Sequence, residues 1–337
     1  MTTAIVILNW NGKKYLEEFV PIVLKHSNFP SVSVYVADNN SIDDSVAFLK
    51  TNFPTVKLIC LQQNYGYANG YNEAIKQLTE DIIVLLNSDI EVTQNWLNPV
   101  LNLFEQDKNI AAIQPKILDY NNRNTFEYAG ASGGFIDKLG YPFCRGRIFN
   151  ELEKDNNQYN TAQPIFWATG ACLFVRREAY LEAGQLDGDF FAHMEEIDLC
   201  WRIKNLGYQV WVQPNSVVYH VGGGTLNKIN PKKTYLNFRN NLFLISKNAP
   251  KRYILFLILA RLVLDGIAGL KFLIEGQASH CWAVVKAHFA FYAKAVSMLK
   301  KRNNKKFKFQ NKVYSEIAVT SVVWKFYIEK KKKFSEL

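Results

Sequence analysis

The sequence predicts an α/β fold with a mainly parallel sheet, followed by a basic helical region toward the C-terminus. Apolar, β-branched runs alternate with segments of helical spacing through residues 3–86, which indicates strands joined by crossover helices. The 337 residues are 48% hydrophobic and 21% charged, which supports a large core and excludes a disordered chain. Five widely spaced cysteines without a CxxC pair exclude a disulfide mini-protein and indicate a reducing, cytosolic compartment.

Apolar runs bounded by polar or turn residues mark the expected strands. They cover residues 3–8, 32–37, 56–61, 81–86, 172–175, 210–212 and 217–219. Helical spacing predicts helices over residues 15–25, 41–52 and 70–78, and a later one from the acids at 195–198 to Gly207. Ser41 can cap the second helix, where Asp43 and Asp44 suit the positive end of its dipole.

Polar residues follow each of the first four strands. In parallel sheets ligands bind at the carboxyl ends of strands, so these residues are expected to converge on one edge. A carboxylate there can accept the imide N–H of a pyrimidine base, an aromatic ring can cover a base or a sugar, and glycine lets the backbone approach a ligand. The strand-end residues are Asn9, Asn11, Asp38, Asn64, Gly66, Tyr67, Asn87, Ser88, Asp89 and Glu91.

A divalent-metal site is predicted at the end of the fourth strand. Alternation along an extended segment would point Asp89 and Glu91 the same way, and two carboxylates suit Mg²⁺ or Mn²⁺. The alternative is that Asp89 only caps the following segment. His220 ends a later strand before three glycines, which makes it a metal-ligand or phosphate-loop candidate.

Three acids stand in the first turn of the helix that begins near residue 195. They are Glu195, Glu196 and Asp198, and one of them is a candidate general base. The structural alternatives are that they complement the helix dipole, and that Asp198 pairs with Arg202 four residues on.

The ordered motifs resemble those of the family-2 glycosyltransferases with the GT-A fold, particularly the bacterial rhamnosyltransferase-like branch. The resemblance covers about residues 3–245, and it rests on seven segments in order. These are VILNWNG (6–12), VADNNSIDDS (36–45), NYGYANGYN (64–72), LLNSDIEV (85–92), TGACLFVRR (169–177), EEIDLCWRIKNLGY (195–208) and HVGGGT (220–225).

The resemblance implies a Rossmann-like GT-A catalytic domain over residues 1–245, with roles for particular residues. Donor binding would fall to Asn9, Asn11, Asp38, Asn64, Gly66, Tyr67, Asn87, Ser88 and Gly170. The ligands of Mg²⁺ or Mn²⁺ would be Asp89, with Glu91 and His220. Trp167 and Trp201 would bind the acceptor, and Glu196 would be the base, with Glu195 as the alternative. Two departures from the family pattern are Asn87, where many members have Asp, and Glu196, where the usual pair reads Glu-Asp.

The expected function is therefore inverting transfer of a sugar from a nucleotide-diphosphate donor, dTDP-rhamnose or a UDP-sugar, to a hydroxyl of a glycan or lipid-linked glycan. Surface-polysaccharide synthesis would be its context. The alternatives are a nucleotidyltransferase, which lacks its usual glycine-rich signature here, and a non-catalytic scaffold of the same fold. A glycoside hydrolase would have no use for Asp38 or a metal.

Charge and hydropathy divide the chain near its last quarter. Residues 1–230 carry a net charge of −7, whereas residues 231–337 carry +17. Residues 253–274 are long enough to span a bilayer, but Arg261, Asp265, Lys271 and Glu275 form a polar stripe that favours a helix lying in the interface, with the stripe in water. Residues 246–337 are thus expected to dock on the cytoplasmic face of the inner membrane. The alternatives are packing on the catalytic domain or a homodimer. Nucleic acid is not expected, because the body is acidic.

Overall fold

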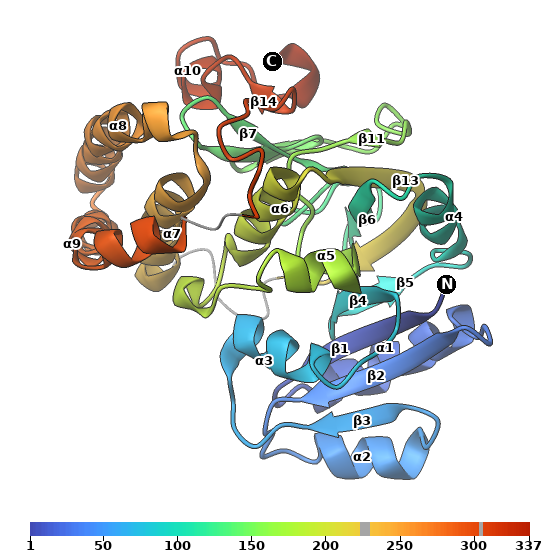
Figure 1. The fold of residues 1–337 in the computed structure, drawn as a ribbon. Helices are drawn as coiled ribbons and strands as arrows, with labels where there is room; N and C mark the ends of the chain where they lie inside the picture. The colour runs from blue at the N-terminus through green and yellow to red at the C-terminus, as the bar shows by residue number, and fades with distance from the viewer. Residues whose placement is uncertain (223–229, 303–305) are drawn as a thin grey trace.

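A computed structural model describes residues 1–222, 230–302 and 306–337. Its centre is a mixed sheet in the order β11-β13-β6-β12-β4-β1-β2-β3, with β5 paired to β13 (Figure 1). The N-terminal half is parallel and confirms the predicted strand–helix alternation. Its elements are β1 (Thr3–Asn9), α1 (Lys13–His26), β2 (Val32–Asp38), α2 (Ser45–Asn52), β3 (Lys57–Cys60), α3 (Gly66–Ile75) and β4 (Ile82–Asn87).

The C-terminal half of the sheet is mixed in direction. β12 (Cys172–Arg176) runs antiparallel to both β4 and β6 (Ile110–Asp119), and β13 (Gln209–His220) runs parallel to β6. The two strands expected at 210–212 and 217–219 are one strand, β13, which continues through a register shift between Gln213 and Val217. The remaining elements here are β5 (Ile90–Val92), α4 (Asn98–Gln106), β11 (Gln163–Pro164), α5 (Arg177–Glu182), η1 (Gly188–Phe190) and α6 (Glu195–Leu206).

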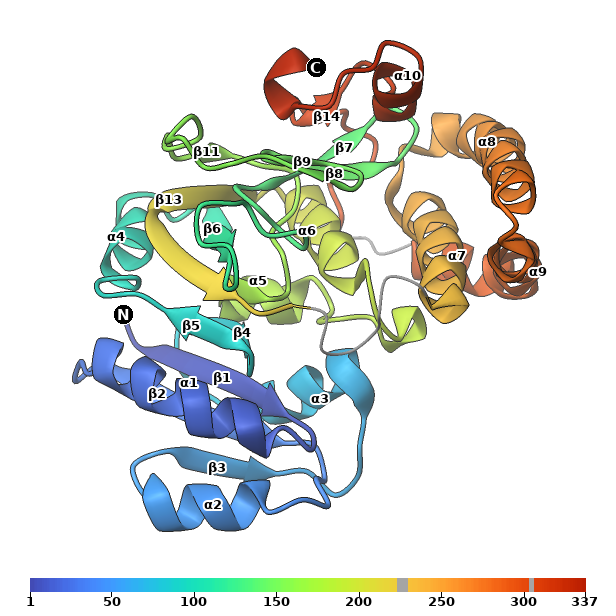
Figure 2. The same ribbon diagram turned by 180° about the vertical axis from the view of Figure 1, so that it is seen from behind.

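Apolar side chains fill both faces of the sheet. β1 and β4 are buried along nearly their whole length, as expected for central strands covered by helices on each side. A second, smaller sheet in the order β10-β9-β8-β7-β14 lies over one end of the first (Figure 2). Its strands are β7 (Gly134–Asp137), β8 (Pro142–Cys144), β9 (Arg147–Ile148), β10 (Glu151–Leu152) and β14 (Ile317–Ala318).

Three long helices form the flank of the molecule opposite α4 (Figures 1 and 2). They are α7 (Pro231–Asn248), α8 (Ile254–Ile274) and α9 (Ala278–Lys301), and the short α10 (Val322–Tyr327) follows them. The expected boundary at residue 245 falls inside α7. Lys294 and Lys301 of α9 reach the loop around η1, where Lys301 pairs with Asp187 at 2.6 Å and Lys294 with Asp189 at 2.9 Å. The helices are therefore fastened to the loop that leads into α6.

Arg261 and Asp265 of the polar stripe of α8 face the protein, which corrects the expectation that the whole stripe lies in water, whereas Lys271 and Glu275 are exposed and pair with each other at 2.6 Å. Arg261 and Asp265 are 2% and 0% exposed. Arg261 pairs with Asp265 at 2.9 Å and lies over the Tyr141 ring, and His288 Nε2 lies 3.0 Å from Asp265. Tyr141 directly precedes β8 and His288 lies on α9, so the sequence of α8 alone does not reveal these partners. The segment Lys251–Ile274 is the one described stretch long and apolar enough to cross a membrane.

Candidate active site

The ends of β1 and β2 form one polar cluster. Their register places Asn9 beside Asp38, and Asn9 Nδ2 donates to Asp38 Oδ1 at 2.9 Å and to Ser41 Oγ at 3.2 Å. The other Asp38 oxygen accepts the Ser41 N–H. Asn9 Oδ1 is buried without a hydrogen-bond partner among the described residues, so it is an acceptor available at this edge. A Cβ at Gly12 would lie 2.5 Å from that oxygen, which explains the glycine.

The loop after β3 is organised by a residue that sequence reasoning missed. Asn39 Nδ2 donates to Asn64 Oδ1 at 2.9 Å, and Asn39 Oδ1 accepts the Tyr65 N–H at 2.9 Å. Asn64 Oδ1 also accepts the Gly66 N–H, so this predicted donor-binding side chain shapes its own turn. The Asn39-Asn40 dipeptide directly after Asp38 was the available signal. The structure thus brings the loops after β2 and β3 together, as predicted from their strand-end positions.

The remaining predicted donor residues lie on the adjoining loops. Asn11 Oδ1 accepts the Ile42 N–H, Asn87 ends β4, and Ser88 begins the turn that follows. Tyr67 of α3 donates its hydroxyl to the carbonyl of Gly170 at 2.8 Å. A Cβ at Gly170 would lie 2.3 Å from that hydroxyl, so the close approach requires glycine there.

Asp89, in the turn between β4 and β5, meets His220 at the end of β13. His220 Nε2 lies 3.2 Å from Asp89 Oδ1, and both side chains are nearly buried. Pairing of β5 with β13 places His220 opposite Ile90, which brings the histidine to the turn that carries Asp89. On its other side, His220 Nδ1 lies 3.3 Å from Glu127 Oε1. Glu127, which sequence reasoning missed, is therefore positioned to orient the imidazole.

The charges of this cluster reinforce each other. Burial alone would lower the pKa of His220, but the carboxylates of Glu127 and Asp89 raise it to about 10. Burial alone would raise the pKa of Asp89, but the hydrogen bond and charge of His220 hold it below its ordinary value. A carboxylate behind a ligating histidine is the usual outer support of a metal site.

The donor set fits a hard divalent cation shared with a substrate. Within the described residues, no three His, Cys, Asp or Glu side chains converge as a complete metal cage. Mg²⁺ and similar ions at phosphate-transfer sites are commonly held by one or two protein ligands, with phosphate oxygens and water completing the sphere. Asp89 and His220 are the two side chains that could hold such an ion here.

Glu91 does not join this pair. Its two carboxylate oxygens accept from the two Nη atoms of Arg123, at 2.9 and 2.7 Å. The same guanidinium lies 4.4 Å from the Tyr219 ring centroid. Ser88 and Asp89 form a turn rather than an extended segment, so the alternation that would have aligned Asp89 with Glu91 is interrupted.

Glu195 and Glu196 are adjacent at the N-terminus of α6. Each has a buried Oε2 atom without a hydrogen-bond partner among the described residues. Burial raises the pKa of both, and the charge of Glu196 raises that of Glu195 further. For Glu196, backbone N–H groups of the helix start oppose the burial, and its pKa lies at about 7. A carboxylate with such a pKa is suited to proton transfer near neutral pH.

Asp198 has a different environment from the two glutamates. Its carboxylate is fully buried and accepts from Arg202, Lys247 and Asn248. Burial alone would raise its pKa, but the charges of Arg202 and Lys247 hold it below the ordinary value. The Asp198–Arg202 pairing expected from their spacing is confirmed, and Asp198 has the surroundings of a structural ion pair.

The Cys144 thiol of β8 experiences the charges of both Glu127 and Glu196. Burial raises the pKa of the Cys144 thiol, and the carboxylates of Glu127 and Glu196 both add to that shift. Cys144 therefore lies within electrostatic reach of both clusters. The predicted acceptor residues Trp167 and Trp201 lie deeper: both are buried, Trp167 Nε1 donates to the Phe135 carbonyl, and Trp201 packs edge-on against Phe166.

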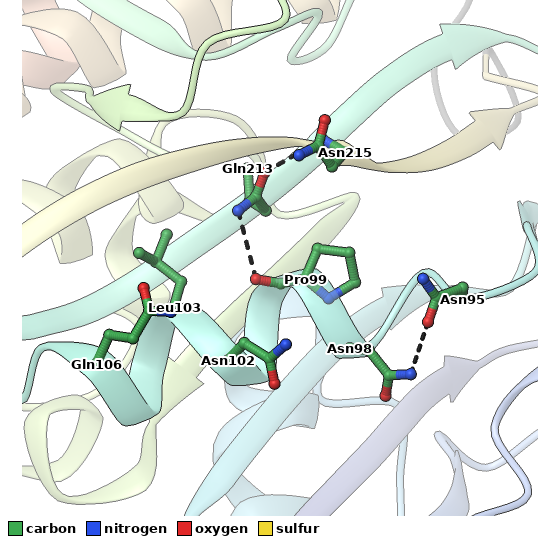
Figure 3. A pocket seen from close by; sticks show the side chains of 8 residues that line it. All are labelled: Asn95, Asn98, Pro99, Asn102, Leu103, Gln106, Gln213 and Asn215. Carbon is green, nitrogen blue, oxygen red and sulfur yellow. Dashed lines mark hydrogen bonds between the residues drawn. The ribbon is translucent and has the colours of Figure 1, made fainter.

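A separate hollow of about 320 Å³ lies between α4 and the bulge of β13 (Figure 3). Its wall is mostly uncharged amide side chains: Gln213 Nε2 donates to the Pro99 carbonyl, and Asn98 Nδ2 to Asn95 Oδ1. None of the predicted site residues lines it. The strand-end clusters, and not this hollow, carry the groups suited to chemistry.

The mixed α/β sheet thus carries a carboxylate–histidine pair near its strand ends, and the start of α6 carries an acid pair in which Glu195 is buried and Glu196 half-buried. The family model described as glycosyl transferase family 2 matches residues 4–183. This match covers more than half of the chain, and the chain therefore belongs to glycosyl transferase family 2.

Relatives in curated proteins agree with this family. The N-acetylglucosaminyl-diphospho-decaprenol L-rhamnosyltransferase of Mycobacterium tuberculosis is 26% identical over 240 residues, covering 66% of this chain and 76% of that protein. The low-salt glycan biosynthesis hexosyltransferase Agl10 of Haloferax volcanii is 22% identical over 251 residues, covering 73% and 75%. The chain is thus a glycosyltransferase with a rhamnosyltransferase-like relative.

Solved structures show the same GT-A-like fold. TarS residues 1–349 of S. aureus, in complex with UDP-GlcNAc, match with a TM-score of 0.56 at 14% identity, covering 92% of this chain and 90% of that one. GalNAc-T7 with UDP, GalNAc and Mn²⁺ matches with a TM-score of 0.58 at 16% identity, covering 73% and 48%. The mannosyltransferase PcManGT of Pyrobaculum calidifontis, with GDP-Man and Mn²⁺, matches with a TM-score of 0.51 at 16% identity, covering 92% and 82%.

Proposed function

We propose that this glycosyltransferase moves a sugar from a nucleotide-diphosphate donor to a hydroxyl of a glycan or lipid-linked glycan, with inversion at the anomeric carbon. The observation that carries the proposal is the acid pair of buried Glu195 and half-buried Glu196, whose buried Oε2 atoms have no hydrogen-bond partner among the described residues and whose pKa values are raised. A buried carboxylate oxygen without a hydrogen-bond partner lowers the stability of the fold. Such groups are concentrated at sites where they take part in a reaction.

The donor is proposed to lie across the ends of β1, β2 and β4. Asn9 and Asp38 would contact its base, and Asp89 with His220 would hold Mg²⁺ or Mn²⁺ beside its diphosphate. A divalent ion there would neutralise the charge that develops on the leaving diphosphate. Glu127, with Oε1 3.3 Å from His220 Nδ1, would help to orient the imidazole, while the hydrogen bond from Tyr67 to the Gly170 carbonyl holds α3 against the segment that enters β12.

Glu196 is proposed as the general base. It would take the proton from the acceptor hydroxyl as that oxygen attacks the anomeric carbon and the bond to the diphosphate breaks. Binding both substrates supplies orientation, and exclusion of water protects the donor from hydrolysis.

The proposed donors are dTDP-rhamnose and UDP-sugars, and the proposed acceptor is a glycan on a lipid diphosphate carrier. The first is supported by the rhamnosyltransferase relative, whose name includes a decaprenyl diphosphate acceptor. A panel of nucleotide sugars, each with and without Mn²⁺, tests the donor by thermal shift. A donor at about a hundredfold its Kd stabilises the fold by about 2.7 kcal/mol.

We also propose that α8 and α9 dock on an anionic membrane surface. Apart from Lys271, which pairs with Glu275, α8 exposes only apolar side chains to solvent, because Arg261 and Asp265 are bound inside the protein. On α8 these are Leu255, Phe256, Leu259, Leu262, Val263, Ile267, Leu270, Leu273 and Ile274, and on α9 Trp282, Phe289, Tyr292, Val296 and Leu299.

Charge complementarity favours a lipid surface over a second copy of the chain as the occupant of this face. Residues 231–337 carry +17, and exposed Lys251, Arg252, Lys286 and Lys300 border the apolar side chains. Two such basic faces would repel each other, whereas anionic headgroups attract them. A peripheral position on the cytoplasmic side of the membrane would bring the enzyme to a lipid-linked acceptor.

A further inference from the structure

The loop 190–194, which leads into the acid pair, has a backbone conformation that is unfavourable for three of its residues. Phe191, His193 and Met194 have φ values of 67°, 69° and 73°, in the left-handed region that side chains with a Cβ rarely adopt. Met194 directly precedes Glu195 at the start of α6. Any relaxation of this loop would therefore move the two carboxylates.

One buried amide on α7 ties this loop down. Asn240 is fully buried, and its Nδ2 donates to the carbonyls of Phe190, Ala192 and His193 at 2.9, 2.8 and 2.8 Å. Its Oδ1 accepts from Arg239 Nε at 2.9 Å and from Nη2 at 2.8 Å. Arg239 Nη2 also donates to the Phe190 carbonyl at 2.8 Å. The two side chains thus bond to three backbone carbonyls, those of Phe190, Ala192 and His193, in the same strained segment.

We propose that Asn240, supported by Arg239, is a positioning residue that holds the loop 190–194 so that Glu196 faces the acceptor. This inference rests on the proposed role of the acid pair. It assigns to α7, outside the residues that match the family model, an indirect part in the active site, through the loop that it holds. The ordinary alternative is that Asn240 only fastens α7 to the catalytic domain.

The neighbouring Asn241 is a matched control. It is on the same helix and 2% exposed, but its Nδ2 donates to the Gly140 carbonyl and its Oδ1 accepts from Arg261. Asn241→Ala therefore removes an equally buried amide with no bond to the loop. Because Arg239 is only half-buried, Arg239→Gln is a milder second variant that still removes its guanidinium from the loop.

The pH dependence of kcat is a second readout, and it would not change if Asn240 only fastened α7 to the catalytic domain. Among the described residues, the titratable groups around the acid pair are Tyr67 of α3, Cys144 of β8, Asp198 and Cys200 of α6, and His193 of the loop itself. From α7, Lys247 pairs with Asp198, and burial together with the charge of Lys233 lowers the pKa of His193 to about 4. Neither substituted residue, Asn240 or Arg239, is one of these groups. Loosening the loop admits water to Glu196, which lowers its pKa toward the ordinary range.

The test measures kcat, donor KM and the acid limb of kcat against pH for the full chain and each variant. Asn240→Ala is expected to lower kcat by about 10²-fold, as misplacement of a catalytic group does, to change donor KM less than about twofold, and to move the acid limb to lower pH. Arg239→Gln should act in the same direction, and Asn241→Ala should change neither kcat nor the acid limb. Equal losses in Asn240→Ala and Asn241→Ala, or an unchanged acid limb, would overturn the proposal.

Hydrogen exchange of the peptide covering 188–197 separates this proposal from the proposed function. Faster exchange in Asn240→Ala and Arg239→Gln, but not in Asn241→Ala, supports the loop contact even if no donor is turned over. If the parent enzyme is active but Asn240→Ala and Arg239→Gln leave this exchange unchanged, the positioning role alone is overturned.

Discussion

His220 Nε2 lies 3.2 Å from Asp89 Oδ1, and this contact joins the turn after β4 to the last residue of β13. Asp89 would contribute a charge to the proposed metal site, whereas His220, whose pKa of about 10 keeps it protonated, would become a neutral ligand only when a bound metal displaces its proton. Asp89→Ala is therefore expected to abolish transfer and metal-dependent nucleotide binding. His220→Ala should weaken the metal dependence less. Isothermal titration of UDP with and without Mn²⁺ measures both, and metal-dependent binding that survives in Asp89→Ala would refute the assignment.

Glu127 supports the same histidine from its other side, with Oε1 3.3 Å from Nδ1. Glu127→Gln leaves Asp89 and His220 in place but removes the charge that orients the imidazole. We expect the Mn²⁺ concentration for half-maximal activity to rise about 10–100-fold, as for other outer-shell carboxylates. Glu91→Gln is the control, since Glu91 pairs with Arg123. An equal effect of the two substitutions would exclude a special role for Glu127.

Glu196→Gln is expected to lower kcat by at least about 10²-fold while leaving donor binding near normal, because a base acts in the transition state. In the parent enzyme kcat should fall as the pH drops through about 7, since protonated Glu196 cannot accept a proton. Stopped-time assays over a pH series measure both. If Glu195→Gln is the inactive variant instead, the base is Glu195.

The same substitution has an effect on stability that depends on pH. The folded-state pKa of Glu196, about 7, exceeds its ordinary 4.5, so its contribution to stability is complete at low pH and is lost as the pH rises through about 7. Glu196→Gln stays neutral throughout. Its Tm should match that of the parent near about pH 5 and exceed it near about pH 8, by about 2–4 °C for each kcal/mol. Exposed Glu105→Gln serves as the control, and a Tm difference independent of pH would contradict the buried ionisation.

The exposed apolar side chains of α8 and α9, proposed to dock on a membrane, are tested by introducing acidic residues on α8. The double substitution Leu259→Glu and Val263→Glu should abolish sedimentation with vesicles that contain anionic lipid, while donor binding is kept. Phe29→Glu, on a loop before β2, should leave sedimentation unchanged. High salt should release the parent protein, because part of the attraction is electrostatic. If the parent chain does not bind vesicles but forms a dimer, and the same double substitution disrupts that dimer, then the apolar surface binds a second copy of the chain.

Sequence patterns predicted the strand–helix order and the convergence of strand-end residues, because hydrophobic periodicity and parallel topology are local or follow from local features. They did not predict Glu127, Arg123 or Asn240, which have no motif around them and reach the site through long-range packing. The expectation for Glu91 assumed an extended segment where the chain turns. The stripe of Arg261 and Asp265 was assigned to water because its partners, Tyr141 and His288, lie far away in sequence.

The most direct test of the central claim measures sugar transfer and nucleotide release by the full-length protein with a panel of dTDP- and UDP-sugars, a lipid-diphosphate-linked acceptor and Mn²⁺. The account predicts turnover with at least one donor, a product of inverted anomeric configuration, and loss of at least about 10²-fold in Glu196→Gln at unchanged donor affinity. Turnover that persists in both Glu196→Gln and Glu195→Gln, or a product of retained configuration, would contradict it.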